Sequence, residues 1–223
     1  MLLYLYEKWL LRNILRAGIA VRHVILIIDE SDLLTRRSKE AIRKLASFVR
    51  WCSELGISTV GIYVSIAKEL RKEIIEATSE LLLERISRVL GRENATVEIY
   101  TPKTVKLLRR DNVAEATTKV CVSIGFGGRS ELTEAIKRIC ARVVRGELEP
   151  EEIDEKVIED ELVFRFEPDL IIRSGGAKLT DFLIWQSVYS EFYFTDVNWQ
   201  DFRKIDLLRA IRDFQKRERR FGT

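Results

Sequence analysis

Histidine and cysteine are scarce in this chain of 223 residues. His23 is the single histidine, which excludes a multi-histidine metal site and a histidine-rich catalytic centre. The three cysteines, Cys52, Cys121 and Cys140, are widely separated and show no Cys-x-x-Cys spacing. Each lies in an apolar run, so we predict buried free thiols in a reducing, cytoplasmic environment.

Long apolar runs are also missing, and none approaches the roughly 18 residues of a membrane-spanning helix. The beginning of the chain instead has the spacing of an amphipathic helix and no small-residue cleavage site of a signal peptide. Its apolar stripe is Leu3, Tyr6, Leu10 and Ile14, with Lys8, Arg12 and Arg16 beside it. We predict a helix packed on the domain, with peripheral contact to a membrane surface as the alternative.

The net charge is only +3 at pH 7, which does not by itself indicate a nucleic-acid partner. Basic residues are concentrated in residues 203–223. The same stretch has an apolar helical stripe of Ile205, Leu208, Ile211 and Phe214. The stripe favours a packed helix with solvated charges over a surface for nucleic acid or anionic lipid. We therefore expect no nucleic acid among the partners.

Apolar strands alternate with amphipathic helices along the chain. The spacing predicts strands over residues 22–29, 58–64, 95–102, 117–128 and 168–176. It predicts helices over residues 38–56, 68–91, 129–146, 150–162, 179–194 and 202–221. The alternation, without repeats or long linkers, predicts a single α/β domain over residues 1–223. Its mostly parallel central sheet would be surrounded by helices.

Three predicted strands end in chemically distinctive residues. Asp29 ends the first, the turn GFGGR at residues 125–129 follows the fourth, and RSGGAK at residues 173–178 follows the fifth. The carboxyl ends of parallel strands meet at one edge of a sheet, where ligands bind in such folds. We therefore expect the functional site at this edge.

Residues 171–180, IIRSGGAKLT, have the composition of an anion site. Glycines let backbone N–H groups approach an anion, Arg173 offers a planar fork, and Lys178 adds a point charge. The spacing is not that of the GxxxxGK[ST] phosphate loop. The segment indicates phosphate or diphosphate binding, and an ordinary strand-to-helix turn is the alternative.

Residues 168–202, continued by RERRFG at residues 217–222, closely resemble the cis-prenyltransferases, the family of undecaprenyl and dehydrodolichyl diphosphate synthases. The first strand and the GFGGRSEL turn look like the same family, so the resemblance extends from about Tyr4 to Gly222. It implies a parallel sheet surrounded by helices, a dimer, and the condensation of isopentenyl diphosphate onto an allylic diphosphate with Mg²⁺. Asp29 matches the family's essential aspartate, and Glu191 matches a second metal-associated carboxylate. A hard dication held by such oxygens would stabilise the leaving diphosphate.

The resemblance also implies binding residues for isopentenyl diphosphate. Arg173 and Thr180 match groups that hold this substrate, and Lys178 stands where the family usually has arginine. Arg220 and Gly222 match an Arg-x-Gly element that reaches toward the active site of the partner subunit.

The chain departs from the family directly after Asp29. The family reads Asp-Gly-Asn-Gly/Arg-Arg-Trp here, whereas this chain reads DESDLL and has a shorter basic loop after it. Glu30 and Asp32 would repel an allylic diphosphate, because like charges 4 Å apart cost about 4 kcal/mol at an effective dielectric near 20. The first hypothesis is therefore a subunit that keeps the isopentenyl diphosphate half-site and works with a more regular homologue, as a heterodimer or heterotetramer. The alternatives are a self-sufficient homodimer with an unusual allylic substrate and a non-catalytic module that binds diphosphate or lipid.

Overall fold

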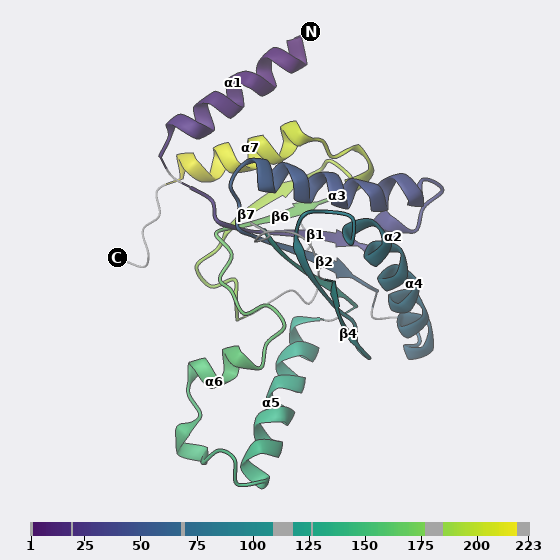
Figure 1. Ribbon diagram of the computed structural model, residues 1–223, viewed down its shortest axis with the longest axis vertical. Coiled ribbons are helices and arrows are strands. Elements are labelled where there is room, and N and C mark those ends of the chain that lie inside the picture. Colours follow the sequence, from purple (N-terminus) through teal and green to yellow (C-terminus); the bar gives the residue numbers. More distant parts are fainter. Residues whose placement is uncertain are drawn as a thin grey trace.

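The computed structural model describes residues 2–18, 20–67, 70–108, 118–125, 127–176 and 185–217. These residues contain a seven-stranded sheet in the order β4-β3-β5-β2-β1-β6-β7 (Figure 1). The strands are β1 (His23–Asp29), β2 (Thr59–Ser65), β3 (Thr96–Tyr100), β4 (Val105–Leu108), β5 (Lys119–Ile124), β6 (Leu170–Ser174) and β7 (Glu191–Thr195). Neighbouring strands are parallel except β3 and β4. The predicted α/β fold with a mostly parallel sheet is confirmed.

One face of the sheet is covered by helices (Figure 1). The α-helices of the described residues are α1 (Leu2–Arg16), α2 (Glu30–Leu33), α3 (Ser38–Glu54), α4 (Lys72–Leu90), α5 (Gly128–Val144), α6 (Glu155–Asp160) and α7 (Lys204–Lys216). Of these, α3, α4 and α7 pack on this face. Side chains alternate along a strand, so Val24, Leu26 and Ile28 of β1 point to the same face. They join the main core, to which α3, α4 and α7 contribute their apolar stripes. This packing holds β1 in the centre of the sheet and fixes where it ends.

The other face carries a smaller core. Ile25 and Ile27 of β1 pack here with Phe164, which lies in the segment after α6. The buried carboxylate of Glu131 on α5 holds this segment, because it accepts hydrogen bonds from the N–H groups of Val163 at 2.7 Å and Phe164 at 3.3 Å. Beyond that attachment, α5 and α6 extend away from the sheet (Figure 1).

Several predicted elements differ from the structure. A helix was predicted over residues 179–194, but its last residues, from Glu191 on, belong to strand β7; residues 179–184 lie outside the described part. Phe192 and Phe194 stack on the same face of that strand, and its pairing with β6 outweighs its helix-like spacing. Strand β4 was not predicted, because its residues are mostly exposed and lack an alternating pattern.

Two of the three cysteines are buried as predicted. Burial raises the pKa of the Cys52 and Cys121 thiols. The prediction is wrong for Cys140, which is exposed because α5 extends away from the sheet. Within the described part of the chain, no helix is long and apolar enough to cross a membrane.

Candidate functional site

The carboxyl edge of the sheet brings Asp29 and Arg173 together. β1 and β6 are neighbours, and Ile27 pairs with Arg173 in the register, so Asp29 lies two residues further along on the same face. Arg173 Nη2 donates a hydrogen bond to Asp29 Oδ2 at 2.6 Å. The arginine side chain is 6% exposed and the aspartate side chain 36%. A buried cation thus presents a half-exposed carboxylate to the edge where the site was predicted.

Helix α2 begins directly after Asp29 and gathers two more carboxylates there. The Asp29 N–H donates to Asp32 Oδ2 at 3.1 Å. Glu30 Oε1 accepts from the N–H of Ala67 at 3.3 Å, which ties α2 to the loop after β2. The segment DESDLL therefore forms a fixed helical turn, with Asp29, Glu30 and Asp32 grouped at its start.

The pKa of Asp32 reports on this acidic group. Burial raises it above its usual value, and the negative charge of Asp29 adds to the rise. The hydrogen bond from the Asp29 N–H and the charge of Arg173 act in the opposite direction. The positive charge of Arg173 thus offsets only part of the negative charge of the acidic group.

The N–H groups of the two glycines after β6, which were predicted to approach an anion, donate to carbonyl groups of the protein. Gly175 and Gly176 have φ values of +81° and +123°, which explains why glycine is needed. Their N–H groups, however, donate to the carbonyl oxygen of Thr195, and that of Gly175 also to Val197. Ser174 Oγ donates to the Val197 carbonyl at 2.8 Å as well. These three donors extend the contact between β6 and the segment around the end of β7, and the rest of the predicted anion segment, residues 177–180, lies outside the described part of the chain.

Glu191 lies at the opposite edge of the sheet. It pairs with Leu170, which pairs with Val24, so Glu191 is level with the beginning of β1. Five residues of β1 then separate it from Asp29, or about 16 Å along the strand. Its carboxylate accepts from Arg217 Nη1 at 2.8 Å. The structure does not bring Asp29 and Glu191 together around one metal ion within a single chain.

Four predicted binding residues lie outside the described part of the chain. These are Lys178, Thr180, Arg220 and Gly222.

The Asp29–Arg173 ion pair itself was not predicted. The two residues are 144 positions apart. The sequence signal for this pair was a charged residue near the end of each of two strands. Local sequence patterns do not show which strands are neighbours in the sheet.

The oxygen donors at the carboxyl edge suit a hard dication better than a soft one. Among the described residues, no group of three or more His, Cys, Asp or Glu side chains is placed to hold a metal ion. Mg²⁺ commonly binds through one or two carboxylates and completes its shell with water and substrate phosphates. Asp29 fits that role, since its carboxylate is half-exposed.

Comparisons with known proteins agree with this architecture. Residues 30–222 match the family model described as putative undecaprenyl diphosphate synthase. The chain is 33% identical over 246 residues to the tritrans,polycis-undecaprenyl-diphosphate synthase (geranylgeranyl-diphosphate specific) of Thermococcus kodakarensis, covering 97% of this chain and 92% of the relative. It is 34% identical over 259 residues to an isoprenyl transferase of Thermus thermophilus, covering 99% and 95%. Both alignments are longer than this chain, so the relatives have residues at places where it has none.

Two solved structures share the fold. Lavandulyl diphosphate synthase from Lavandula x intermedia, in complex with dimethylallyl diphosphate, has a TM-score of 0.72 at 24% identity, covering 92% of this chain and 99% of that one. A probable undecaprenyl diphosphate synthase from Campylobacter jejuni has a TM-score of 0.66 at 23% identity, covering 92% and 100%.

Proposed function

Because the chain belongs to the undecaprenyl diphosphate synthase family of cis-prenyltransferases, we propose that it takes part in making polyprenyl diphosphates from isopentenyl diphosphate and an allylic diphosphate. The condensation forms a carbon–carbon bond between the two prenyl units, breaks the allylic carbon–oxygen bond, and releases diphosphate and a proton. It needs charge stabilisation on the leaving group more than a nucleophilic side chain. The Asp29–Arg173 pair at the carboxyl edge is suited to that task.

Each residue of the pair has a separate role. The planar guanidinium of Arg173 has further N–H groups that can hold the diphosphate of isopentenyl diphosphate. The Asp29 contact keeps that guanidinium in one orientation. The half-exposed Asp29 carboxylate would hold Mg²⁺, which when bound supplies positive charge to the diphosphate oxygens. Lys178, Thr180, Arg220 and Gly222 remain proposed substrate-binding residues from the family resemblance.

We further propose that this chain is the diverged subunit of a heteromeric enzyme. The observation that carries this proposal is the acidic group of Asp29, Glu30 and Asp32. An allylic diphosphate beside it would meet three carboxylates, and Arg173, which the described residues place there, already contacts Asp29. A regular homologous subunit, in a heterodimer or heterotetramer, would supply the allylic diphosphate site.

Exposed apolar residues offer a surface for such a subunit. They lie on α5, just before β7 and within β7, and are Ile136, Val144, Val188, Tyr189 and Phe194. Val144 is 88% exposed, which is costly for a side chain that stays in water.

Co-expression with a homologue that has an intact Asp-Gly-Asn loop tests the proposal. We expect the two chains to co-purify and to incorporate radiolabelled isopentenyl diphosphate with Mg²⁺ at a higher rate than the homologue alone. Asp29→Asn in this chain is the matched control and should lower that rate without loss of co-purification. Failure to co-purify, or an unchanged rate, would refute the heteromeric role.

A self-sufficient homodimer is the second candidate. It is supported by the intact Asp29–Arg173 pair and by full-length similarity to synthases such as that of Thermococcus kodakarensis. The purified chain, incubated with Mg²⁺, isopentenyl diphosphate and a panel of allylic diphosphates, would then form product alone. If the chain forms no product alone and leaves the rate of the homologue unchanged, a non-catalytic module that binds diphosphate or lipid is favoured instead.

A further inference from the structure

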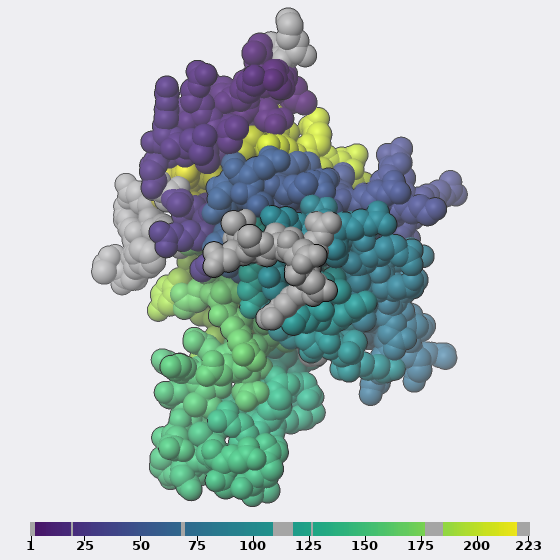
Figure 2. Space-filling model, viewed as in Figure 1, coloured from purple at the N-terminus to yellow at the C-terminus, as the bar shows by residue number. Residues whose placement is uncertain are grey.

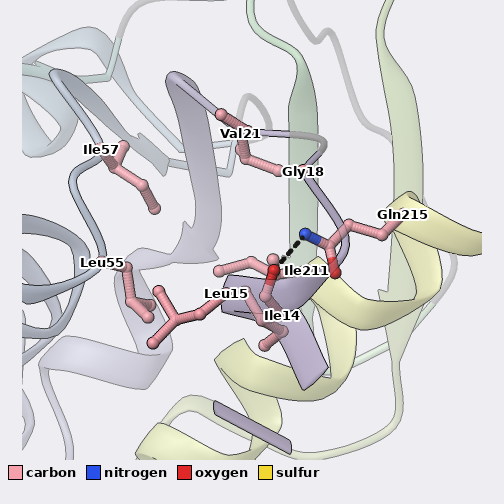
Figure 3. Close-up of a pocket in the computed structure, with 9 residues that line it drawn as sticks. Ile14, Leu15, Gly18, Val21, Leu55, Ile57, Ile211 and Gln215 are labelled. Atoms are coloured by element: carbon pink, nitrogen blue, oxygen red, sulfur yellow. Dashed lines mark hydrogen bonds between the residues drawn. The ribbon is translucent and has the colours of Figure 1, made fainter. Parts of the chain in front are cut away.

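Helix α1 has two halves in different environments. In its second half, Leu10 and Ile14 are buried against α7. The side-chain amide of Gln215 on α7 donates to the Ile14 carbonyl oxygen at 3.1 Å, beside a small hollow of about 210 Å³ (Figure 3). In the first half, the Arg209 guanidinium of α7 lies over the Tyr6 ring at 5.6 Å. Beyond that contact, the beginning of α1 diverges from α7 (Figure 1).

The first half exposes large apolar and aromatic side chains. They are Leu3 (48% exposed), Tyr4 (60%), Leu5 (56%), Tyr6 (39%) and Trp9 (57%). Tyr6 and Trp9 stack on each other with ring centroids 5.8 Å apart. Figure 2 shows α1 as an outer layer at one end of the molecule. Several large exposed apolar side chains in the first half of an outer helix mark a contact site for a protein or a membrane.

Positive charge accompanies these apolar residues. Helices α1 and α7 carry seven basic and three acidic side chains, an excess of four, whereas the whole chain has a net charge of only +3. Two of the acids are already paired: Asp213 with Arg217 at 2.7 Å, and Asp206 with Arg209 at 3.3 Å. The excess charge of the chain is therefore concentrated on this pair of helices.

A cleft of about 350 Å³ between the two helices combines both properties. It is lined by Tyr6, Trp9 and Leu10 from α1, Tyr193 from β7, and Arg209, Arg212, Asp213 and Lys216 from α7. The Nε of Arg212 is buried and has no hydrogen-bond partner among the described residues. A buried donor without an acceptor is costly, so an acceptor oxygen entering the cleft would be stabilised.

We propose that α1 and the adjoining face of α7 form a docking surface for an anionic lipid membrane. The aromatic and aliphatic side chains of the first half of α1 enter the headgroup layer, where Tyr and Trp are favoured. Arg209, Arg212 and Lys216 bind lipid phosphates, and the cleft takes one of them. Lys8 lies over the Tyr4 ring at 4.5 Å, which leaves its ammonium at the rim of the apolar surface.

Charge favours a membrane over a second copy of this chain on the same surface. A symmetric dimer brings identical patches together, so the cations of one copy would face those of the other. An anionic surface attracts the same cations. This docking surface does not depend on the proposed catalytic function.

Vesicle sedimentation of the purified full chain tests the proposal. We expect binding to vesicles of phosphatidylcholine with about 30 mol% phosphatidylglycerol, weak binding to phosphatidylcholine alone, and weakening with NaCl. Arg209→Gln combined with Arg212→Gln and Lys216→Gln should weaken binding about a hundredfold, roughly fivefold for each cation. Arg88→Gln combined with Lys137→Gln and Arg145→Gln, which removes the same charge from α4 and α5 or their ends, should leave binding close to that of the native chain.

A second pair of variants tests how much the exposed apolar side chains contribute to vesicle binding. Leu3→Gln combined with Leu5→Gln and Trp9→Gln should abolish most binding, whereas Leu81→Gln combined with Val105→Gln and Leu107→Gln, exposed apolar residues elsewhere, should not. Circular dichroism checks the fold of each variant. If a variant fails to fold, the native chain alone still tests the proposal. Equal binding of the native chain to anionic and neutral vesicles would overturn it. Equal vesicle binding by the two charge variants would also overturn the proposal. A dimer in solution that is disrupted by the changes at Leu3, Leu5 and Trp9 would overturn it too.

Discussion

A carboxylate–arginine pair lies at each end of the strands, one at the carboxyl edge of the sheet and one at the amino edge. At the carboxyl edge, Arg173 Nη2 and Asp29 Oδ2 are 2.6 Å apart, and the arginine is buried with only 6% of its side chain exposed. At the amino edge, Arg217 Nη1 and Glu191 Oε2 are 2.8 Å apart, with side chains 41% and 27% exposed. The two N–O distances are similar, but the arginine is buried in the first pair and partly exposed in the second.

That difference separates a functional site from a surface contact. Burying an arginine costs desolvation free energy, which the attraction to one carboxylate offsets only in part. An exposed pair costs little and contributes about 0–1 kcal/mol. We therefore propose the buried Arg173 as an element of the substrate site, whereas the Arg217–Glu191 pair is a partly exposed contact between β7 and the end of α7.

The largest expected effect is on activity, from Asp29→Asn. Loss of the charge removes the proposed Mg²⁺ ligand, and we expect the rate of prenyl transfer to fall on the order of a thousandfold. The amide oxygen can still accept from Arg173, but the buried guanidinium loses its paired charge, so chemical denaturation should show a free energy of unfolding lower by about 1–2 kcal/mol. Activity that survives the change would remove the carboxyl edge from the chemistry.

Glu131→Ala should have the largest effect on stability. Glu131 is a carboxylate held mainly by backbone donors, and its loss leaves the buried N–H groups of Val163 and Phe164 without their acceptor. We expect the free energy of unfolding to fall by about 2–3 kcal/mol in urea. Glu131→Gln keeps an acceptor oxygen and should cost less, and equal losses for the two variants would contradict this account.

Asp32→Asn tests how the acidic group affects the stability of the fold at different pH values. Burial raises the folded-state pKa of Asp32 above its usual 3.8, so its protonated form stabilises the fold at low pH and that contribution is lost as pH rises through the raised pKa. The amide should therefore stabilise the protein at pH 7 relative to the native chain, and the gain should vanish near pH 3. Thermal melts at the two pH values measure this, and a gain that is the same at both would contradict it.

The same variant should strengthen anion binding. Removing one negative charge beside Arg173 should raise the affinity for inorganic diphosphate several-fold at an effective dielectric near 20 and after screening. Calorimetric titration measures the change. Unchanged affinity would mean that the anion binds away from α2.

Glu191→Gln should have the smallest effect. We expect a change of less than about 0.5 kcal/mol in stability, because the pair with Arg217 is exposed. The Mg²⁺ concentration needed for half-maximal activity should also stay the same, since Glu191 is about 16 Å along the strand from Asp29. A higher Mg²⁺ requirement would show that Glu191 reaches a metal ion through a second subunit.

Much of the fold could be predicted from local patterns. The run from Val24 to Ile28 is buried on both faces, as a continuous apolar strand predicts. The stripes of α3 and α7 face the core because apolar residues recur at the helical period. Strands β4 and β7 were missed, because an edge strand depends on the partner it pairs with more than on its own sequence.

The candidate site was predicted in its parts but not in its arrangement. Asp29 and Arg173 were each identified at a strand end, and the acidic character of residues 29–32 was visible. That the N–H groups of Gly175 and Gly176 are taken by Thr195 and Val197 could not be read locally. The partners lie about 20 residues further along the chain, at the end of β7 and just beyond it, and most of that strand was predicted as a helix.

The sequence by itself determined the α/β class, the family, and the strand that delivers Asp29, because these depend on periodicity and motifs within short segments. Only the tertiary structure decided which charged groups meet. Strand order placed Arg173 beside Asp29, and register placed Glu191 at the other edge. Packing likewise decided that half of α1 is buried on α7 while the other half stays exposed. Contacts between distant segments depend on how the whole chain closes its core, which no local pattern records.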